Sequence, residues 1–388
     1  MVWRRKIGIF PWHFNKDIQL LQSGESFFNE LLFLIRSAKI SIYFQVYIFD
    51  GDETGKVVYE ELLAAAKRGV NVYLHLDAFG SKEFPPIWEL SLKQHGAKIE
   101  FFSRFKFAFR YHIGMRLHHK IIIIDENISL VGGINISDNY SHLGKQKTWL
   151  DFAIQMEGNT VKDLLKICIQ IENGFSPLSK FDKEKLIYNN PIGLVKARVL
   201  QNYWLFAKFG ISRQYRQNIR KAREEILIIT SYFVPSPALK RLLKKAAKRG
   251  VKVRLVLGSI SDVGIVKHAS HFFYGDLLKS GVEIWEWQPS VLHAKLAFVD
   301  HQWMCIGSYN LNYLSDFGST ECNIEILDKP FQQKCLNQIN TLLKNDAVKI
   351  DATAYLNESN VFIKIRNFLS YHILSISLKI LFYFQKQK

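Results

Sequence analysis

The sequence lacks any hydrophobic run long enough to cross a membrane, and it lacks a cysteine pattern typical of disulfides or metal centres. Its four cysteines form no CxxC pair, so we expect reduced thiols that pack as small apolar side chains. The opening stretch MVWRRKIGIFPWHF has no apolar segment of signal-peptide length. We therefore expect a protein that is soluble or lies on a membrane without spanning it.

Acidic residues are scarce relative to basic ones. The chain has 52 Lys and Arg against 35 Asp and Glu, a formal net charge of +17. Such a surface attracts polyanions, either nucleic acid or anionic lipid headgroups. At 388 residues and 48% hydrophobic content, the chain has ample core for one large α/β domain or two of average size.

Two distant stretches, LHHKIIIIDENISLVGGINISD and LHAKLAFVDHQWMCIGSYNLN, share one spacing of polar residues. Each has a His, a Lys two residues later, and then an Asp, a Gly and an Asn at matching intervals. The shared residues are His118, Lys120, Asp125, Gly132 and Asn135 in the first stretch and His293, Lys295, Asp300, Gly307 and Asn310 in the second.

The rest of the chain is duplicated as well. AAAKRGVNVYLHLD returns as KAAKRGVKVRLVLG, and in both copies a helix should end at a glycine, Gly69 or Gly250, before a strand. The order strand, helix, strand, hairpin occurs twice, which predicts an α/β fold with a largely parallel sheet. We expect a lead at 1–16, similar halves at 17–190 and 191–350 about a pseudo-twofold axis with the active site between them, and a separate segment at 351–388.

Each repeated stretch reads as a β-hairpin. A turn centred between Glu126 and Asn127 would place His118 opposite Asn135 and Lys120 opposite Gly133, and the second copy would place His293 opposite Asn310. Glycine on the returning strand would leave space for a ligand to approach the backbone.

The two aspartates of the repeat are not expected at the open ends of the hairpins. Seven residues of strand span about 20 Å, so Asp125 and Asp300 should sit at the turns, far from the open ends. We expect them to cap the turn or to pair with a neighbouring cation.

The open ends of two such hairpins would gather two imidazoles, two ammonium groups and two carboxamides around one small volume. A singly charged phosphodiester fits this set, because its oxygens need donors and the lysines can supply the charge that Mg²⁺ often supplies. We therefore expect no cofactor and no metal. A metal site on His112, His118 and His119 is the alternative, which nearby Lys120 and Lys295 disfavour.

A nucleophilic imidazole also needs an acceptor for its other nitrogen. Asp151 and Glu321, each downstream of one hairpin, are the candidates. Glu325 is an alternative to Glu321 for orienting His293, and these acids could instead pair with surface cations.

With HxKxxxxD and GxxN present twice, the chain resembles the phospholipase D superfamily, and within it the bacterial cardiolipin synthases of the short type. The likeness runs from about Asp17 to about Asp346. It implies a metal-independent phosphatidyl transfer through a phosphohistidine, with phosphatidylglycerol as donor and acceptor, His118 as nucleophile and His293 as acid/base. The family's acid after the second motif falls on Glu321. The implied site residues are His118, Lys120, Asp125, Asn135, Asp151, His293, Lys295, Asp300, Asn310 and Glu321.

Two rival functions use the same residues differently. One is a phospholipase D hydrolase or a nuclease, with water or DNA as the partner. The other is a non-catalytic binder of anionic lipid or nucleic acid. Many relatives read Asn-Leu-Asp-x-Arg-Ser after the second motif, and this sequence departs from that pattern at Asn312 and Leu314, which leaves the subtype and the acceptor open.

Three segments could contact a membrane. They are the basic and aromatic stretch FFSRFKFAFRYHIGMRLHH, a helix with Arg213, Arg216, Arg220 and Arg223 on one face, and the amphipathic end of the chain. We expect anionic phospholipid and a membrane surface as partners, with no nucleic acid and peripheral attachment at the cytoplasmic face. Removing 360–388 should leave the fold and the site intact. The oligomeric state stays open.

Overall fold

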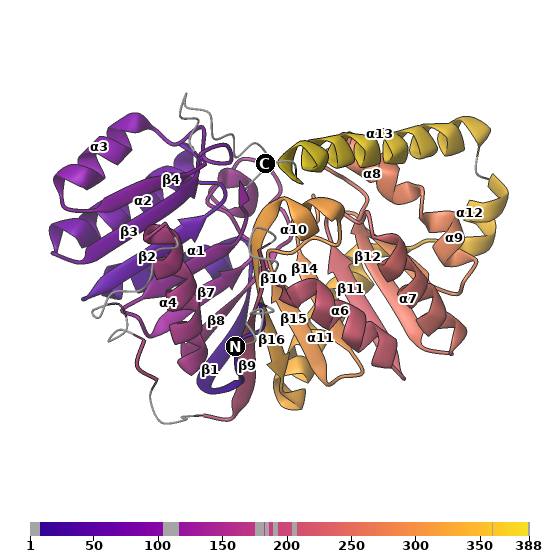
Figure 1. Cartoon of the computed structure of the whole chain (residues 1–388), viewed down its shortest axis with the longest axis horizontal. Helices are drawn as coiled ribbons and strands as arrows, with labels where there is room; N and C mark the ends of the chain where they lie inside the picture. Colours follow the sequence, from indigo (N-terminus) through magenta and orange to yellow (C-terminus); the bar gives the residue numbers. More distant parts are fainter. Residues whose placement is uncertain are drawn as a thin grey trace.

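The structure is a computed structural model of the chain that describes residues 8–103, 116–174, 182, 186–188, 193–203, 208–358 and 360–386. Two lobes of similar build lie side by side, the first in indigo to magenta and the second in orange to yellow (Figure 1). The basic and aromatic stretch predicted to meet the membrane falls largely on 104–115, outside the described residues.

One continuous sheet runs through both lobes, and each lobe contributes about half of its strands. In the first lobe the pairings run β4-β3-β2-β6-β7-β8-β1, and in the second β16-β15-β14-β11-β12-β13-β17, with β9 joining β1 to β16. The strands are β1 (His13–Gln22), β2 (Ser41–Val46), β3 (Asn71–Asp77), β4 (Lys98–Phe102), β5 (Arg116–Leu117), β6 (Lys120–Ile124), β7 (Ile128–Gly132), β8 (Phe152–Gly158), β9 (Val195–Tyr203), β10 (Lys208–Phe209), β11 (Glu225–Thr230), β12 (Lys252–Gly258), β13 (Glu283–Trp287), β14 (Lys295–Val299), β15 (Trp303–Gly307), β16 (Ser319–Leu327) and β17 (Ala347–Lys349).

The predicted α/β duplication is confirmed, but the expectation of a largely parallel sheet is wrong. Parallel pairing among the described strands is confined to β2-β3-β4, β11-β12-β13 and the short contact of β5 with β16. The hairpins and the strands that follow them pair antiparallel. The helix-linked strands are parallel because a crossover helix returns the chain in the same direction, whereas a tight turn reverses it.

Helices cover the two faces of the sheet. They are α1 (Glu25–Ser37), α2 (Glu53–Lys67), α3 (Pro86–Gln94), α4 (Asn159–Glu172), α6 (Gly210–Lys221), α7 (Pro237–Lys248), α8 (Gly264–His271), α9 (Tyr274–Leu278), α10 (Tyr313–Phe317), α11 (Lys329–Asp346), α12 (Ala352–Glu358) and α13 (Val361–Lys386). The repeated helices α2 and α7 stop as predicted, because Gly69 and Gly250 adopt φ of 88° and 90°, a backbone conformation that glycine accepts without steric cost.

The two hairpins form, but their register differs from the predicted one by one residue. Lys120 lies opposite Gly132, and Leu296 opposite Ile306. The cause is the turn: Asp125 and Glu126 both have positive φ, 50° and 58°, and three residues separate the paired Ile124 and Ile128. The ladder is therefore centred on Glu126.

The lobes share a hydrophobic core. One cluster of buried side chains lies within each lobe, and a third contains residues of both, including α4 and α11. Leu164 and Ile167 of the first lobe belong to the same cluster as Ile324 of the second. The lobes thus fold against each other, and this fixes the open ends of the two hairpins relative to one another.

Helix α13 lies on the second lobe beside α8 and reaches toward the boundary between the lobes (Figure 1). Its buried positions include Asn367 and Ser370. No helix in the described part of the chain is both long and apolar enough to cross a bilayer.

Candidate active site

A cavity of about 440 Å³ lies where the lobes meet. Both motif histidines and both motif asparagines line it, so the predicted convergence of the two open ends occurs. Its other walls combine aromatic and apolar side chains with polar ones and with the charged Arg116 and Asp262. The lining residues include Tyr47, Arg116, His118, Asn135, Tyr140, Tyr232, Asp262, Val263, Val266, His293, Asn310, Leu314 and Leu374.

His118 is held by a strand of the opposite lobe. Its backbone N–H donates to the carbonyl of Thr320 over 3.1 Å, which continues the parallel contact of β5 with β16. The next residue on β16, Glu321, is fully buried, and its Oε2 lies 2.9 Å from Nδ1 of His118. A carboxylate at Nδ1 favours the tautomer with the proton on that nitrogen and leaves Nε2 facing the site as a nucleophile or base.

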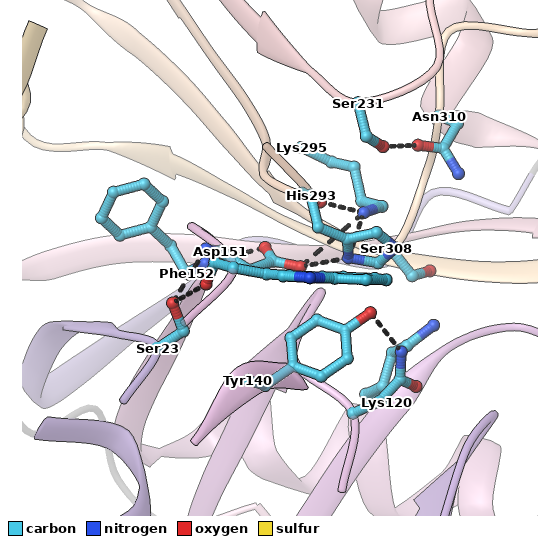
Figure 2. A network of polar contacts seen from close by, with 12 residues as sticks. Ser23, Lys120, Tyr140, Asp151, Phe152, Ser231, His293, Lys295, Ser308 and Asn310 are labelled. Atoms are coloured by element: carbon cyan, nitrogen blue, oxygen red, sulfur yellow. Dashed lines mark hydrogen bonds and ion pairs between the residues drawn. The ribbon is translucent and has the colours of Figure 1, made fainter. Parts of the chain in front are cut away.

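His293 has the same arrangement with the roles of the lobes exchanged, as Figure 2 shows. Its N–H donates to the carbonyl of Leu150 over 2.8 Å, as part of the bridge between Leu150 and Leu292. Asp151 follows directly, and its Oδ2 lies 2.6 Å from Nδ1 of His293. The imidazole is thereby fixed by an acid of the first lobe.

The two acids therefore act crosswise, and the expectation that Glu321 or Glu325 orients His293 is wrong. Glu321 serves His118 and Asp151 serves His293. Glu325 accepts hydrogen bonds from Arg198 and from the indole of Trp303, so it belongs to a separate buried ion pair. The exchange follows from the contacts between lobes, because each acid lies beside the strand of the other lobe's histidine.

Two serines that sequence reasoning missed hold these acids in place. Ser308 Oγ donates to Glu321 Oε2 over 2.5 Å. Ser23 holds the backbone of Asp151 through two hydrogen bonds. Its Oγ accepts from the N–H of Asp151 over 3.0 Å, and its backbone N–H donates to the Asp151 carbonyl over 2.9 Å. Ser308 follows the glycine of the second motif, and comparing it with Gly133 in the first would have singled out this position.

Glycine on the returning strand has a different role from the predicted one. A Cβ on Gly133 would lie 2.4 Å from Oδ2 of Asp151, and a Cβ on Gly132 would lie 2.3 Å from the carbonyl of Phe152. The space is therefore taken up by Asp151 and by strand β8, and the glycines serve the approach of protein groups to each other.

The two lysines are almost fully buried. Nζ of Lys120 donates to the carbonyl of His118 over 2.6 Å, and Nζ of Lys295 donates to the carbonyl of His293 and lies 3.7 Å from Asp151. Burial, and then repulsion from Lys295, lowers the pKa of Lys120 to about 7. Burial also lowers the pKa of Lys295. These shifts favour release of a proton from the lysines, and a bound anion would oppose that release.

The pKa shifts of the two imidazoles and of Asp151 all favour the uncharged form of the side chain. Burial lowers the pKa of both His118 and His293, in part opposed by Glu321 at His118. Burial raises the pKa of Asp151 to about 6, although the positive charge of the nearby Lys295 acts to lower it. All these shifts favour uncharged forms, the expected state of a closed pocket whose counter-ion is a substrate.

The asparagines present their amides to the cavity through fixed contacts. Oδ1 of Asn135 accepts from the N–H of Ile48 over 3.1 Å, and Oδ1 of Asn310 accepts from Ser231 Oγ over 2.8 Å. The amide nitrogen of Asn135 contacts the hydroxyl of Tyr140. With Oδ1 engaged, each Nδ2 is oriented as a donor, the group that phosphate oxygens require.

The model of a family described as cardiolipin synthase, PLD-like domain, matches residues 31–147 and 215–343, so each match contains one hairpin. The chain belongs to this family. It is 32% identical to Cardiolipin synthase B of Salmonella typhi over 345 residues, covering 88% of the chain and 83% of the relative. It is 30% identical to Minor cardiolipin synthase ClsB of Bacillus subtilis, covering 81% and 78%. The crystal structure of phosphatidylserine synthase from Haemophilus influenzae has the same fold, with a TM-score of 0.68, 14% identity and 97% of each chain covered.

The motif aspartates of this PLD-like chain lie at the turns, as the spacing predicts. The Asp125 carboxylate accepts hydrogen bonds from the N–H groups of Lys39, Ile40 and Ser41. Asp300 repeats this with the N–H groups of residues 223–225. Each carboxylate thus ties its hairpin to the start of the neighbouring strand, β2 or β11, which pairs antiparallel with the hairpin. The expected turn cap is in fact a link between strands.

The alternative metal site does not assemble around His118. His119 points into the core, where its Nε2 lies 2.8 Å from Oε1 of Gln45, because successive residues of an extended chain face opposite ways. His112 lies outside the described residues. In the parts of the chain that the structure describes, no group of three or more His, Cys, Asp or Glu side chains could hold an ion.

Proposed function

We propose that the protein is a cardiolipin-synthase-type phosphatidyltransferase that works through a phosphohistidine, with phosphatidylglycerol as donor and acceptor. The observation that supports this best is the pair of imidazoles at one cavity, each held at Nδ1 by a buried carboxylate of the opposite lobe. Two equivalent His–acid pairs suit a reaction in two similar displacements, because one group must attack while the other moves the proton.

In the first displacement, Nε2 of His118 attacks phosphorus and the bond from phosphorus to the headgroup oxygen breaks. His293 gives its proton to the departing glycerol. In the second, His293 takes the proton from the hydroxyl of the acceptor lipid, whose oxygen attacks phosphorus as the phosphorus–nitrogen bond breaks. Lys120, Lys295 and the two asparagine amides stabilise the charge on the remaining phosphate oxygens.

The proposed order of steps requires a protonated His293, and the charge of the bound substrate favours that form. Burial and the cations of Lys295 and Lys120 lower the pKa of His293 and so oppose its protonation. A phosphodiester anion offsets those cations, so binding of the donor lipid and loading of His293 with a proton favour each other.

A lipid substrate is also supported by the walls of the cavity. Val263, Val266 and Leu314 lie on one lobe, and Leu374 of α13 closes the same side. Apolar walls beside a site for an anion fit a molecule with a charged headgroup and apolar chains.

We further propose that α13 rests on an anionic membrane surface at the cytoplasmic face. Its outward stripe is apolar, with Phe362 80% exposed and Ile365 and Leu369 each 50% exposed, while Asn367 is buried on the inward face. A surface helix usually turns its apolar face inward and its polar face to solvent, and this part of α13 does the opposite. Lys364 and Arg366 flank the stripe and are exposed, where each could contribute on the order of 1 kcal/mol near anionic lipid.

The activity is tested by incubating the purified protein with phosphatidylglycerol vesicles and separating the products. We expect cardiolipin and glycerol in equal amounts, with loss of both products in His118→Ala and His293→Ala. The control is His95→Ala, on the exposed end of α3, which should remain active. Phosphatidic acid as the sole lipid product would instead make the protein a hydrolase.

Membrane attachment is tested by flotation with the same vesicles. Ile365→Ser/Leu369→Ser should float less than the unmodified protein. The matched control is Phe33→Ser/Ile40→Ser, which removes two side chains of similar exposure, 62% and 59%, in the first lobe. Equal loss in both double variants would contradict a specific role for α13.

A further inference from the structure

A second cavity, of about 550 Å³, lies on the second lobe. It forms where α12 and α13, which follow the duplicated unit, cover α9 and α8 (Figure 1). None of the described residues that line it also lines the catalytic cavity. Its size is within the range of about 300–1,000 Å³ that is common for ligand sites. We call this second cavity the α13 groove.

Aromatic contacts fix the helices around the α13 groove. Tyr371 of α13 stacks on Phe272, with ring centroids 4.7 Å apart. Tyr355 of α12 packs against Tyr274 of α9 at 5.7 Å, and its hydroxyl donates to the carbonyl of His271 over 3.4 Å. The groove therefore lies between helices that are anchored at both of its ends.

The open side of the groove is apolar. Val361 and Phe368 line it and are 65% and 48% exposed. Ile365 also lines it and belongs to the outward stripe of α13 that we propose to rest on the membrane. Contiguous exposed apolar surface of this kind marks an interaction site. In this position, an acyl chain can pass from the bilayer into the groove along an apolar path.

The charged groups of the groove leave a positive excess. Asp276 is paired with Lys240 and Lys244. Lys279 and Lys364 are exposed at the groove, and neither has an acidic partner among the residues that the structure describes. Two such ammonium groups beside an apolar groove suit a ligand that joins a phosphate to an apolar chain.

A buried acceptor lies at the same groove. Asn367 lines it and is 4% exposed, and its Oδ1 is buried with no hydrogen-bond donor in the described part of the chain. A ligand that donates a hydroxyl proton would satisfy this oxygen. Lys364 lies three residues earlier, so both side chains are neighbours on one side of α13. Together they suit a headgroup that carries a phosphate and a hydroxyl.

We propose that the α13 groove binds one anionic phospholipid of the membrane whose headgroup carries a hydroxyl, as in phosphatidylglycerol. Its acyl chain lies along Phe272 and Leu356. Its phosphate lies at Lys279 and Lys364, and its hydroxyl donates to Asn367. The inference rests on the proposed membrane contact of α13 and adds a lipid site outside the catalytic cavity. This lipid takes no part in the reaction and fastens α12 and α13 to the second lobe.

The test uses phosphatidylglycerol with a diazirine at the end of one acyl chain, mixed into phosphatidylcholine vesicles. Irradiation and peptide mapping then locate the chain. We expect label on α9 and α12, neither of which lines the catalytic cavity. Phosphatidylcholine with the same diazirine should label them about tenfold less, because its headgroup has no net charge. Label confined to the outward stripe of α13, or equal labelling by both lipids, would overturn the inference.

Gly275 of α9 offers a matched pair of variants. A Cβ there would lie 3.7 Å from Cδ2 of Leu356, an ordinary contact distance, so Gly275→Ala should keep the label on α12. Gly275→Leu extends a side chain into the groove and should reduce that label about tenfold, because the space for the chain is filled. Unchanged label on α12 in Gly275→Leu contradicts the proposal.

The headgroup contacts have their own control. Lys279→Gln/Lys364→Gln should reduce the label on α12 about tenfold, as the loss of two cations near anionic lipid implies. Lys67→Gln/Lys344→Gln removes two exposed lysines of α2 and α11 and should not reduce it. Equal loss in both double variants would show that overall charge, and not the groove, attracts the lipid.

A soluble phosphodiester with a nitrophenyl leaving group separates this inference from the proposed function. The Gly275 and lysine variants should release nitrophenol at close to the unmodified rate, because these residues lie outside the catalytic cavity. Absence of groove labelling in a protein that still forms cardiolipin overturns the inference alone. Groove labelling in a protein that forms no cardiolipin overturns the proposed transfer function and supports the lipid site.

Discussion

At the scale of single residues, the site is defined by which acid holds which imidazole. Glu321 and Asp151 are equally buried and each contacts one Nδ1. They differ in the neighbour that supports them, since Ser308 donates to Glu321 whereas Asp151 lies against Lys295. Replacing each carboxylate by its amide should therefore separate the roles of the two histidines.

With a nitrophenyl donor, Glu321→Gln should slow the first release of nitrophenol by a factor on the order of 10² to 10⁴, because the nucleophilic tautomer of His118 is lost. Asp151→Asn should keep this first release, since nitrophenolate leaves without a proton, and should slow the later turnover. Stopped-flow absorbance resolves the two phases. A fast first phase in Glu321→Gln and a slow one in Asp151→Asn would reverse the assignment.

Lys120 gives the clearest dependence on pH. Its pKa is lowered from 10.5 to about 7 in the folded protein. Between these values the unfolded chain binds more protons, so this lysine's contribution to stability rises with pH. Binding of an anion should reverse the shift. At pH 8, dimethyl phosphate should therefore bind with proton uptake, measured by calorimetry in buffers of different ionisation enthalpy. Lys120→Met should abolish most of that uptake, and uptake that is unchanged in this variant would place the proton on another group.

At the scale of elements, the hairpins carry the histidines and lysines at one end and an aspartate at the other. Asp125→Asn should lower the free energy of unfolding by about 1–3 kcal/mol, since a charged acceptor of three backbone N–H groups becomes a weaker one. The turnover of folded enzyme should change little, because the site lies at the opposite end of the hairpin. Thermal unfolding and activity per folded molecule test this together. A variant that keeps its melting temperature but loses a thousandfold in activity would contradict the account.

Helix α13 corrects an expectation drawn from the duplication. Because the repeated units end before it, the sequence predicted that removing 360–388 would leave the site intact. Yet Leu374 lines the cavity, and Tyr371 stacks on Phe272 with ring centroids 4.7 Å apart. The truncated protein should fold with a lower melting temperature, float less with anionic vesicles and show a raised KM for a short-chain phosphodiester. Normal KM and normal flotation together would show that α13 serves neither the site nor the membrane.

Sequence patterns predicted most of these elements because they are local. The His–x–Lys strands, the turn aspartates and the glycines at 69 and 250 each follow from spacing within a few residues. The hairpin register was missed by one position because it depends on the φ angles of Asp125 and Glu126, which composition does not reveal.

At the scale of the whole molecule, the site exists only where the lobes meet. Each His–acid pair joins residues of different lobes, through β5 with β16 and through the bridge of Leu150 with Leu292. No local pattern reports such a contact, so sequence reasoning found both acids without their partners. The shared core across the lobes then holds both pairs at once.

The central claim is that the lobes supply different groups to one reaction, with His118 as nucleophile and His293 as acid/base. It is tested most directly by quenching the protein during turnover of phosphatidylglycerol labelled in the phosphate that it transfers, followed by mapping the labelled peptide. The account predicts an acid-labile phosphatidyl group on His118, with more label in Asp151→Asn, whose breakdown step is slowed. Label on His293, or turnover without any labelled histidine, would contradict it.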